Sequence, residues 1–266
     1  MSQVLFKVKV GKLKSLTENQ THYCAGCEHG TLTKLIASAM DELGIRERTV
    51  MVNSVGCSAL AYNYFNCDHI VAPHGRAPAV AAGLKRVRPD LMVFSVQGDG
   101  DAGAIGLLEL IYAAKRSTPI TLFLVNNAVY GMTGGQMAPT TLQGQVTTTT
   151  PFGRDPALTG TEFDISKLLA GIDGAAYVRR ASLVLTELSS SKGKVYTIKN
   201  ILEAKKSVEN AFKVQAMGGF AFIEFLSTCS VNWKMSIFEA KRHVNDEIIK
   251  KYPLGLFKDT FGVEKQ

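Results

Sequence analysis

The stretch from Leu91 to Thr133 constrains the fold of this chain more than any other. It opens with a continuous apolar run, Leu91 to Val96, which is typical of a strand buried on both faces of a sheet. After Gly98-Asp99-Gly100-Asp101 the apolar residues recur at helical spacing, and a second apolar run, Ile120 to Val125, ends at Asn126-Asn127. This order predicts a strand–helix–strand unit of an α/β sheet. Ligands of such sheets bind at the carboxyl ends of the strands, where the two polar segments both lie.

The glycine-rich turn of this unit has two interpretations. Gly98, Gly100 and Gly103 match GxGxxG, the dinucleotide-binding fingerprint. A dinucleotide-binding site usually has an acidic residue at the end of the second strand, where this sequence has Asn126-Asn127. Asp99 would also repel a pyrophosphate unless a divalent cation lay between them. Asp99 therefore makes better sense as a ligand of Mg²⁺, with an Asn side chain and a backbone carbonyl after Asn127 as further oxygen ligands.

Length and composition limit the number of domains, the location and the partners of the chain. A chain of 266 residues with 46% apolar content is expected to form one α/β domain over residues 1–266. It has no run of 18 uncharged apolar residues and no apolar N-terminal run typical of a signal peptide, so we expect a cytoplasmic protein without a membrane segment. The net charge of +7 fits an acidic partner, or simply a soluble surface. The scattered basic residues, without an RNA-binding aromatic motif, argue against nucleic acid.

The cysteines are expected to be ligands or core residues. Five is an odd number in a chain expected to be intracellular, which argues against a disulfide framework. Cys24 and Cys27 form a CxxC just before a predicted helix, Glu28 to Leu43, whose N-terminus is expected to lower the pKa of both thiols. A lone CxxC fits a redox dithiol, half a zinc site or an iron–sulfur site about equally. A zinc site expects a second close pair, whereas four thiolates from dispersed loops fit a 4Fe-4S cluster.

Several longer strings resemble one family. GDG followed, 28 positions after its Asp, by the second Asn of NN resembles the thiamine diphosphate motif. The string YGMTGGQMAPTT, Tyr130 to Thr141, is similar to the β subunit of the 2-oxoacid:ferredoxin oxidoreductases, and CAGCEHG, VGCSA, HGRAPAVAAGLKRVRP and STCSVNW agree with it. The match extends from about Ser15 to YPLGLFKD near the C-terminus. It implies an α/β fold with a doubly wound, mostly parallel sheet, the thiamine diphosphate-binding fold.

The resemblance also implies thiamine diphosphate, Mg²⁺ and a 4Fe-4S cluster as cofactors. The Mg²⁺ ligands are Asp99, Asn127 and the carbonyl of Val129. The cluster ligands are Cys24, Cys27, Cys57 and Cys229, which leaves Cys67 as a structural thiol. Arg76 belongs to the cofactor pocket or pairs with Asp68 or Asp99. The other implied cofactor-binding residues are Ser58, His74, Gly75, Gly98, Gly100, Asp101, Gly131, Met132 and Thr133.

The reaction implied is oxidative decarboxylation of a 2-oxoacid to acyl-CoA and CO₂, with electrons passed through the cluster to ferredoxin. The implied partners are an α subunit, ferredoxin-like γ and δ subunits, ferredoxin, coenzyme A and the 2-oxoacid. No catalytic residue is assigned in this chain, because the activating Glu of the family comes from the α subunit. Gly134 stands where relatives acting on 2-oxoglutarate often carry Lys, which favours a branched-chain 2-oxoacid.

Other substrates and other functions stay open. Pyruvate and 2-oxoglutarate are alternative substrates. A non-redox thiamine diphosphate-dependent decarboxylase subunit would need neither the four cysteines nor ferredoxin. A zinc-binding module with a basic surface would contain zinc and no thiamine diphosphate. Metal and cofactor content distinguishes these three classes of protein.

The chain also departs from the family pattern. Ala25 replaces a common Pro in the CxxC turn, and about a dozen residues are inserted at 183–196, which predicts a surface loop or an added subunit contact. Residues 1–23 are expected to form an arm across a neighbouring surface, and 237–266 a C-terminal helix and tail. The other predicted elements are strands at 50–55, 175–178 and 220–226, and helices at 77–87, 165–169, 198–215 and 237–251.

Overall fold

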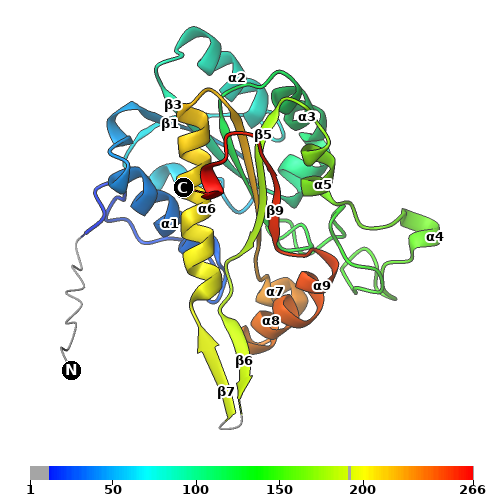
Figure 1. The fold of residues 1–266 in the computed structure, drawn as a ribbon. Helices are drawn as coiled ribbons and strands as arrows, with labels where there is room; N and C mark the ends of the chain where they lie inside the picture. The colour runs from blue at the N-terminus through cyan, green and yellow to red at the C-terminus, as the bar shows by residue number, and fades with distance from the viewer. Residues whose placement is uncertain (1–11, 191–192, 266) are drawn as a thin grey trace, which may run out of the picture.

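A computed structural model describes residues 12–190 and 193–265 of this chain. Its centre is a seven-stranded sheet with the order β2-β1-β3-β4-β8-β5-β9 (Figure 1). Neighbouring strands are parallel, except that β9 runs antiparallel to β5. The strands are β1 (Thr49–Asn53), β2 (Asp68–Val71), β3 (Met92–Gly98), β4 (Thr121–Asn126), β5 (Ala175–Ser182), β8 (Phe220–Leu226) and β9 (Gly255–Asp259).

Helices cover both faces of the sheet, so the predicted doubly wound α/β fold is confirmed. On one face, α1 (His29–Glu42) and α6 (Lys199–Ala216) pack together. The other face is covered by α2 (Ala77–Val87), α3 (Leu107–Lys115) and α5 (Ile165–Ala170). The strands supply alternate residues to the two cores, as their period of two requires.

The core between α6 and the sheet is aromatic. Phe94 on β3, Phe123 on β4 and Phe212 on α6 are all buried. The Phe212 ring meets those of Phe94 and Phe123 nearly edge-on, with centroids 5.9 and 5.8 Å apart. Edge-to-face packing of this kind stabilises a core beyond the burial of area alone. It fixes the two strands whose ends carry the polar segments.

The segment of residues 230–252 packs at the lower end of the sheet in Figure 1. It contains α7 (Ser230–Trp233), α8 (Ile237–His243) and α9 (Ile249–Lys251). The single helix predicted for 237–251 is therefore interrupted, by a π-helical turn over Val244–Ile248. The start of α8 is held by a capping box between Ser236 and Glu239.

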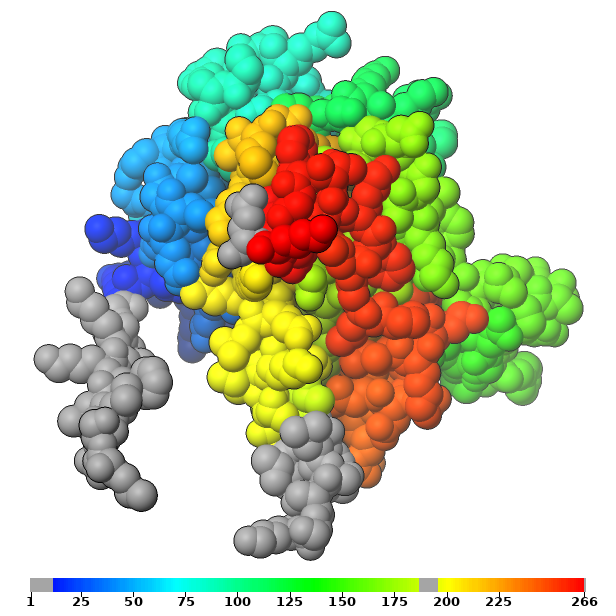
Figure 2. All heavy atoms as spheres, viewed as in Figure 1, coloured from blue at the N-terminus to red at the C-terminus, as the bar shows by residue number. Residues whose placement is uncertain are grey.

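Two segments lie at the periphery, and one of them, the insertion, differs from the sequence prediction. The insertion at 183–196 forms a β-hairpin, β6 (Thr186–Ser190) and β7 (Gly193–Thr197), rather than a loop, and this hairpin is a separate two-stranded sheet. The threonine-rich segment after Gln143 is mainly irregular and contains only the short α4 (Pro156–Thr159), which projects from the body (Figure 2).

The described part of the N-terminal arm lies on its own chain. The Ser15 hydroxyl donates to Asp41 on α1 at 2.6 Å, and the Thr17 N–H donates to the Tyr64 carbonyl at 2.9 Å. Residues 1–11 of the predicted arm lie outside the described residues. The assignment of residues 1–266 to one domain stays a prediction. Among the helices described, none is long and apolar enough to cross a membrane.

Candidate functional site

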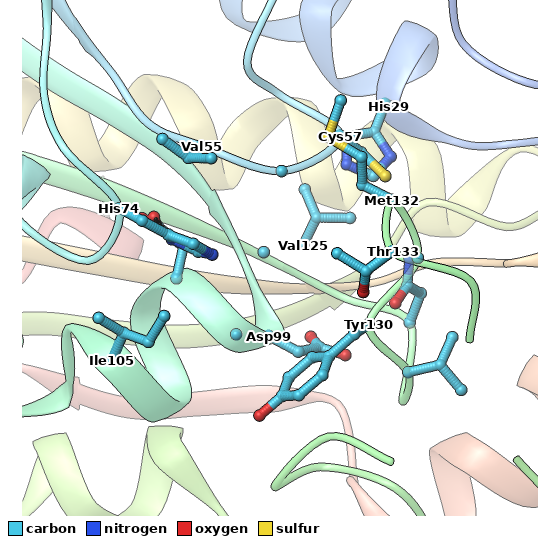
Figure 3. A pocket seen from close by; sticks show the side chains of 17 residues that line it. His29, Val55, Cys57, His74, Asp99, Ile105, Val125, Tyr130, Met132 and Thr133 are labelled. Atoms are coloured by element: carbon cyan, nitrogen blue, oxygen red, sulfur yellow. Dashed lines mark hydrogen bonds and ion pairs between the residues drawn. The ribbon is translucent and has the colours of Figure 1, made fainter. Parts of the chain in front are cut away.

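A cavity of about 440 Å³ opens at the carboxyl ends of β1, β3 and β4 (Figure 3). Of the residues expected to bind the cofactor, it is lined by Cys57, His74, Gly98, Asp99, Gly100, Asp101, Asn127, Val129, Gly131, Met132 and Thr133. Ser58, Gly75 and Arg76 are not among the lining residues. The cavity is therefore formed where the topology predicts, from segments far apart in the sequence.

Six lining residues were not expected from the sequence. They are His29, Val55, Gly56, Ile105, Val125 and Tyr130. The apolar ones have no chemical signal of their own, because apolar residues are common in strands and helices. His29 does have one, since it follows Cys27 by two residues, and its Nδ1 lies 3.0 Å from the Cys27 Sγ. In Figure 3, His29 and Cys57 lie together at one end of the cavity, and His74 and Ile105 at the other.

Asp99 lies on the floor of the cavity as a buried carboxylate with no hydrogen-bond partner among the described residues. It is only 3% exposed, and neither of its oxygens accepts a hydrogen bond of normal geometry. Burial raises its pKa from 3.8 to about 8, while the nearby Thr140 hydroxyl and the backbone of Asn127 and Val129 act in the opposite direction. An unpaired buried carboxylate is costly unless a cation binds it. Because Asn127 and Val129 line the same cavity, these residues fit a Mg²⁺ ion.

The Asp101 carboxylate is hydrogen-bonded to neighbouring protein groups at the cavity wall. Its Oδ1 accepts hydrogen bonds from the Gly75 N–H at 2.8 Å and from the His74 Nδ1 at 2.5 Å, and its Oδ2 accepts from the Gln97 amide. With Nδ1 bonded to this carboxylate, Nε2 is the free nitrogen of His74. Gly75 has φ of +78°, and a Cβ there would lie 2.8 Å from the backbone nitrogen of Gly106. Only glycine fits this close approach.

Arg76 pairs with neither of the expected carboxylates. Its guanidinium binds Glu109 on α3, rather than Asp68 or Asp99. The reason is its position at the start of α2, which packs against α3. Arg76 therefore joins two helices beside the cavity. The prediction of an Asp68 or Asp99 pair was wrong.

The CxxC segment is tied to the segment that carries Cys229. The Thr228 hydroxyl donates to the Gly26 carbonyl at 2.6 Å, and the Ser230 hydroxyl to the Ala25 carbonyl at 3.4 Å. A Cβ added to Gly26 would lie 2.7 Å from the Ile237 side chain. Ile237, at the start of α8, thus packs closely against the CxxC turn.

Four of the five thiols gather beside the end of the cavity that is lined by Cys57. A Cβ on Gly131 would lie 3.2 Å from the Cys57 Sγ and 3.7 Å from the Cys229 Sγ. Cys24, Cys57 and Cys229 are each close enough to Cys27 to raise its pKa. Cys67 instead packs against the apolar core beneath α1. Its position fits the structural role expected of it.

The expected lowering of the Cys27 pKa by the helix N-terminus was wrong. Burial is the larger effect and raises the pKa of the Cys27 thiol to about 12 and that of Cys57 to about 11. Burial likewise keeps His29 neutral by lowering its pKa to about 4. These thiols would become thiolates only beside a strong positive charge, which a bound metal supplies.

The thiols do not form a compact site for a single ion. Within residues 12–190 and 193–265, no three His, Cys, Asp or Glu side chains converge so as to hold one metal ion. A four-iron cluster binds each thiolate at a different iron, so its ligands surround a larger core than those of zinc. Four gathered but separated thiols therefore fit a cluster better than a zinc ion.

Comparisons with known proteins agree with this geometry. Residues 54–198 match the family model of the thiamine pyrophosphate (thiamine diphosphate) enzyme C-terminal domain, described as TPP-binding. The ketoisovalerate oxidoreductase subunit VorA of Methanothermobacter thermautotrophicus is 46% identical over 240 residues, which cover 90% of this chain and 48% of that subunit. The chain thus spans about half the length of this relative.

A shorter relative is covered more completely. The 2-oxoglutarate synthase subunit KorB of Archaeoglobus fulgidus is 32% identical over 231 residues, which cover 87% of this chain and 78% of that subunit. A structure of the 2-oxoglutarate:ferredoxin oxidoreductase of Magnetococcus marinus superposes with a TM-score of 0.75 and 26% identity, covering 96% of this chain and 87% of that chain. This chain belongs to the thiamine diphosphate-binding subunits of the 2-oxoacid oxidoreductases.

Proposed function

We propose that this chain is the β subunit of a 2-oxoacid:ferredoxin oxidoreductase, which converts a 2-oxoacid and coenzyme A to acyl-CoA and CO₂ and passes the electrons to ferredoxin. The observation that carries the proposal is the buried Asp99, without a hydrogen-bond partner among the described residues, in a cavity that is also lined by Cys57, one of four thiols that lie near one another. A non-redox decarboxylase subunit would need only the first feature. A zinc-binding module would need neither the cavity nor Asp99.

Thiamine diphosphate and Mg²⁺ fit the floor of the cavity. Asp99, the Asn127 side chain and the Val129 carbonyl would hold the ion, whose charge would match the carboxylate and the diphosphate. His74, with Nδ1 bonded to Asp101, offers Nε2 to the same pocket. When bound, thiamine diphosphate supplies the electron sink for decarboxylation, and the protein supplies its position and the exclusion of water.

The 4Fe-4S cluster would be held by Cys24, Cys27, Cys57 and Cys229. Of these thiols, Cys57 also lines the cavity. A cluster bound there would lie directly beside the cofactor site, as one-electron transfer between the two centres requires. The gathered thiols support this ligand set, and Cys67 lies outside it.

The substrate is proposed to be a branched-chain 2-oxoacid. Gly134, with φ of +110°, presents no cation to a second carboxylate, and no Lys or Arg is among the residues that line the described cavity. The 46% identical relative is named for ketoisovalerate, whereas relatives named for 2-oxoglutarate are 32–36% identical over 208–231 residues or, over a shorter stretch of 144 residues, 42% identical. Pyruvate and 2-oxoglutarate are the alternative substrates.

The enzyme is proposed to need partner subunits. Asp99 and Asp101 are the carboxylates that line the described cavity, and both lie at the Mg²⁺ side, so neither serves as the activating Glu. An α subunit would supply it, and the further proposed partners are γ and δ ferredoxin-like subunits and ferredoxin, in the cytoplasm. We expect the isolated chain to bind cofactor poorly and to be inactive. Turnover by the purified single chain would contradict this.

The test is the cofactor content of the complex purified anaerobically with its partners. About four iron, four sulfide and one thiamine diphosphate for each copy of this chain are expected, after subtraction of any iron bound by separately analysed partner subunits. Cys229→Ala should lower the iron content and the ferredoxin-linked activity while thiamine diphosphate stays bound. Cys67→Ser is the matched control and should keep both.

A panel of 2-oxoacids then identifies the substrate. Thiamine diphosphate without iron on this chain would favour the non-redox decarboxylase subunit. Zinc without thiamine diphosphate would overturn the assignment of Asp99 and Asn127. Preference for 2-oxoglutarate over branched-chain acids would overturn only the argument from Gly134.

A further inference from the structure

A buried ion pair lies behind the proposed Mg²⁺ ligands. Glu224 on β8 and Arg180 on β5 are both 0% exposed, and Arg180 Nε donates to Glu224 Oε2 at 2.8 Å. Arg180 also binds Asp164 and lies over the rings of Tyr252 and Phe257. Replacing a buried ion pair by apolar residues is often neutral or stabilising, so the pair is poorly explained by stability alone.

The second oxygen of Glu224 fixes the orientation of one amide. Its Oε1 accepts a hydrogen bond of 2.7 Å from Nδ2 of Asn126, which ends β4 and is fully buried. A carboxylate can only accept, so the NH₂ group of Asn126 must face it. The amide oxygen of Asn126 therefore points the other way, where it accepts from the Ala128 N–H at 3.0 Å.

Ala128 is the turning point of the segment that carries the proposed ligands. Its φ of +57° is left-handed, a conformation that costs a non-glycine residue about 1–2 kcal/mol. It is held on both sides, because its N–H is bonded to Asn126 and its carbonyl accepts from the Thr141 hydroxyl at 2.6 Å. With the turn in this form, Asn127 and Val129, on either side of Ala128, both line the cavity.

We propose that Glu224, balanced by Arg180, is a positioning residue for the Mg²⁺ site, because it orients the Asn126 amide and so holds the turn that carries Asn127 and Val129. This inference rests on the proposed function. Glu224 is not among the residues that line the cavity, and its hydrogen bond to the proposed ligand segment is the one with Asn126. Arg180 pairs with the buried Glu224 carboxylate and so balances its charge in the core.

The test is Glu224→Gln in the complex with its partner subunits. A glutamine has one acceptor oxygen and one NH₂ group, so it cannot accept from both Asn126 and Arg180. With thiamine diphosphate at saturation, the Mg²⁺ concentration for half-maximal binding, measured by calorimetric titration, should rise 10- to 100-fold, as for other groups that orient metal ligands.

The matched control is Glu264→Gln. Glu264 accepts from the Arg179 guanidinium at 2.8 Å and from the Tyr177 hydroxyl at 2.5 Å. Arg179 neighbours Arg180 on β5, so the two side chains point to opposite faces of the sheet. Glu264→Gln should lower the thermal midpoint yet leave the Mg²⁺ requirement within about twofold of wild type, because its partners do not reach the turn.

The outcomes separate this inference from the proposed function. If Glu224→Gln lowers the thermal midpoint but keeps the wild-type Mg²⁺ requirement, the pair is structural and the inference is overturned. If the wild-type complex binds neither Mg²⁺ nor thiamine diphosphate, the proposed function itself falls, and the inference with it. Should Glu224→Gln fail to fold, Asn126→Ala removes the same contact to Ala128 and must raise the Mg²⁺ requirement; an unchanged value would refute the role of this link.

Discussion

Replacing Asp99 by Asn is expected to stabilise the metal-free protein while it removes the Mg²⁺ site. The pKa of Asp99 rises from 3.8 in the unfolded chain to about 8 in the folded one. Above pH 3.8 the unfolded chain therefore releases a proton that the folded protein keeps, and the free energy of unfolding falls by about 1.4 kcal/mol per pH unit up to the folded pKa. At pH 7 the accumulated cost is about 4 kcal/mol.

The asparagine variant escapes this cost but leaves an unpaired amide, which costs about 1–3 kcal/mol. The net gain at pH 7 is about 2 kcal/mol, or roughly 4–8 °C in the thermal midpoint for a chain of this size. The assay is thermal unfolding in EDTA between about pH 5 and pH 8. The wild-type midpoint should fall across this range relative to that of the variant.

When Mg²⁺ and thiamine diphosphate are added, the wild type should become more stable than Asp99→Asn. Ligands at 100 times their Kd stabilise the wild type by about 2.7 kcal/mol, and they should not stabilise Asp99→Asn. The reasoning would be refuted if the variant were less stable than the wild type in EDTA at pH 7 and the difference did not change with pH. Asp99 would then have a partner in the folded protein that compensates its burial, and a cation would not be needed for that purpose.

Three further changes test other parts of the structure. Gly131→Ala places a methyl group 3.2 Å from the Cys57 Sγ and should lower iron content and thiamine diphosphate binding together, whereas Gly83→Ala, with open space around it, should lower neither. Phe212→Ala should cost about 3–5 kcal/mol in urea unfolding, because it empties the aromatic core under α6. Replacing 186–197 by a two-residue linker should keep the thermal midpoint, since Thr186 already pairs with Thr197; loss of subunit assembly in gel filtration would show that the hairpin is a subunit contact.

Buried elements could be predicted from the sequence because their patterns are unambiguous. The predicted helix 77–87 and strand 220–226 coincide with α2 and β8. By contrast, β2 and β9 at the two edges of the sheet were not predicted. Most residues of β2 are exposed, and its sequence, DHIV, has neither the apolar run nor the alternation of a buried strand. Edge strands are recognised by pairing with a neighbour, which no local pattern reveals.

In the site too, residues at strand ends could be predicted, whereas contacts that depend on packing could not. The positions of Asp99, Asn127 and Cys57 could be predicted, because each follows a strand and the ends of parallel strands meet. The partner of Arg76 could not, because Glu109 lies on another helix and only packing brings them together. The direction of the Cys27 pKa shift was missed for a similar reason. The helix N-terminus is visible in the sequence, but the larger effect, burial, is a property of the assembled fold.

The order of the strands explains how two proposed metal sites share one cavity. Along the sheet, β1, β3, β4 and β8 are consecutive neighbours, and the segments that follow them carry Cys57, Asp99, Asn127 and Cys229 in that order. The segments after the inner two strands thus carry the proposed oxygen ligands, and those after the outer two carry thiols that both lie near Gly131. A shift of the end of β4 is therefore expected to move Gly131 against these two thiols, so the geometry of the two proposed sites is coupled. The pair of Glu224 and Arg180 joins β8 to the end of β4 and to β5, and we expect these contacts to oppose such a shift.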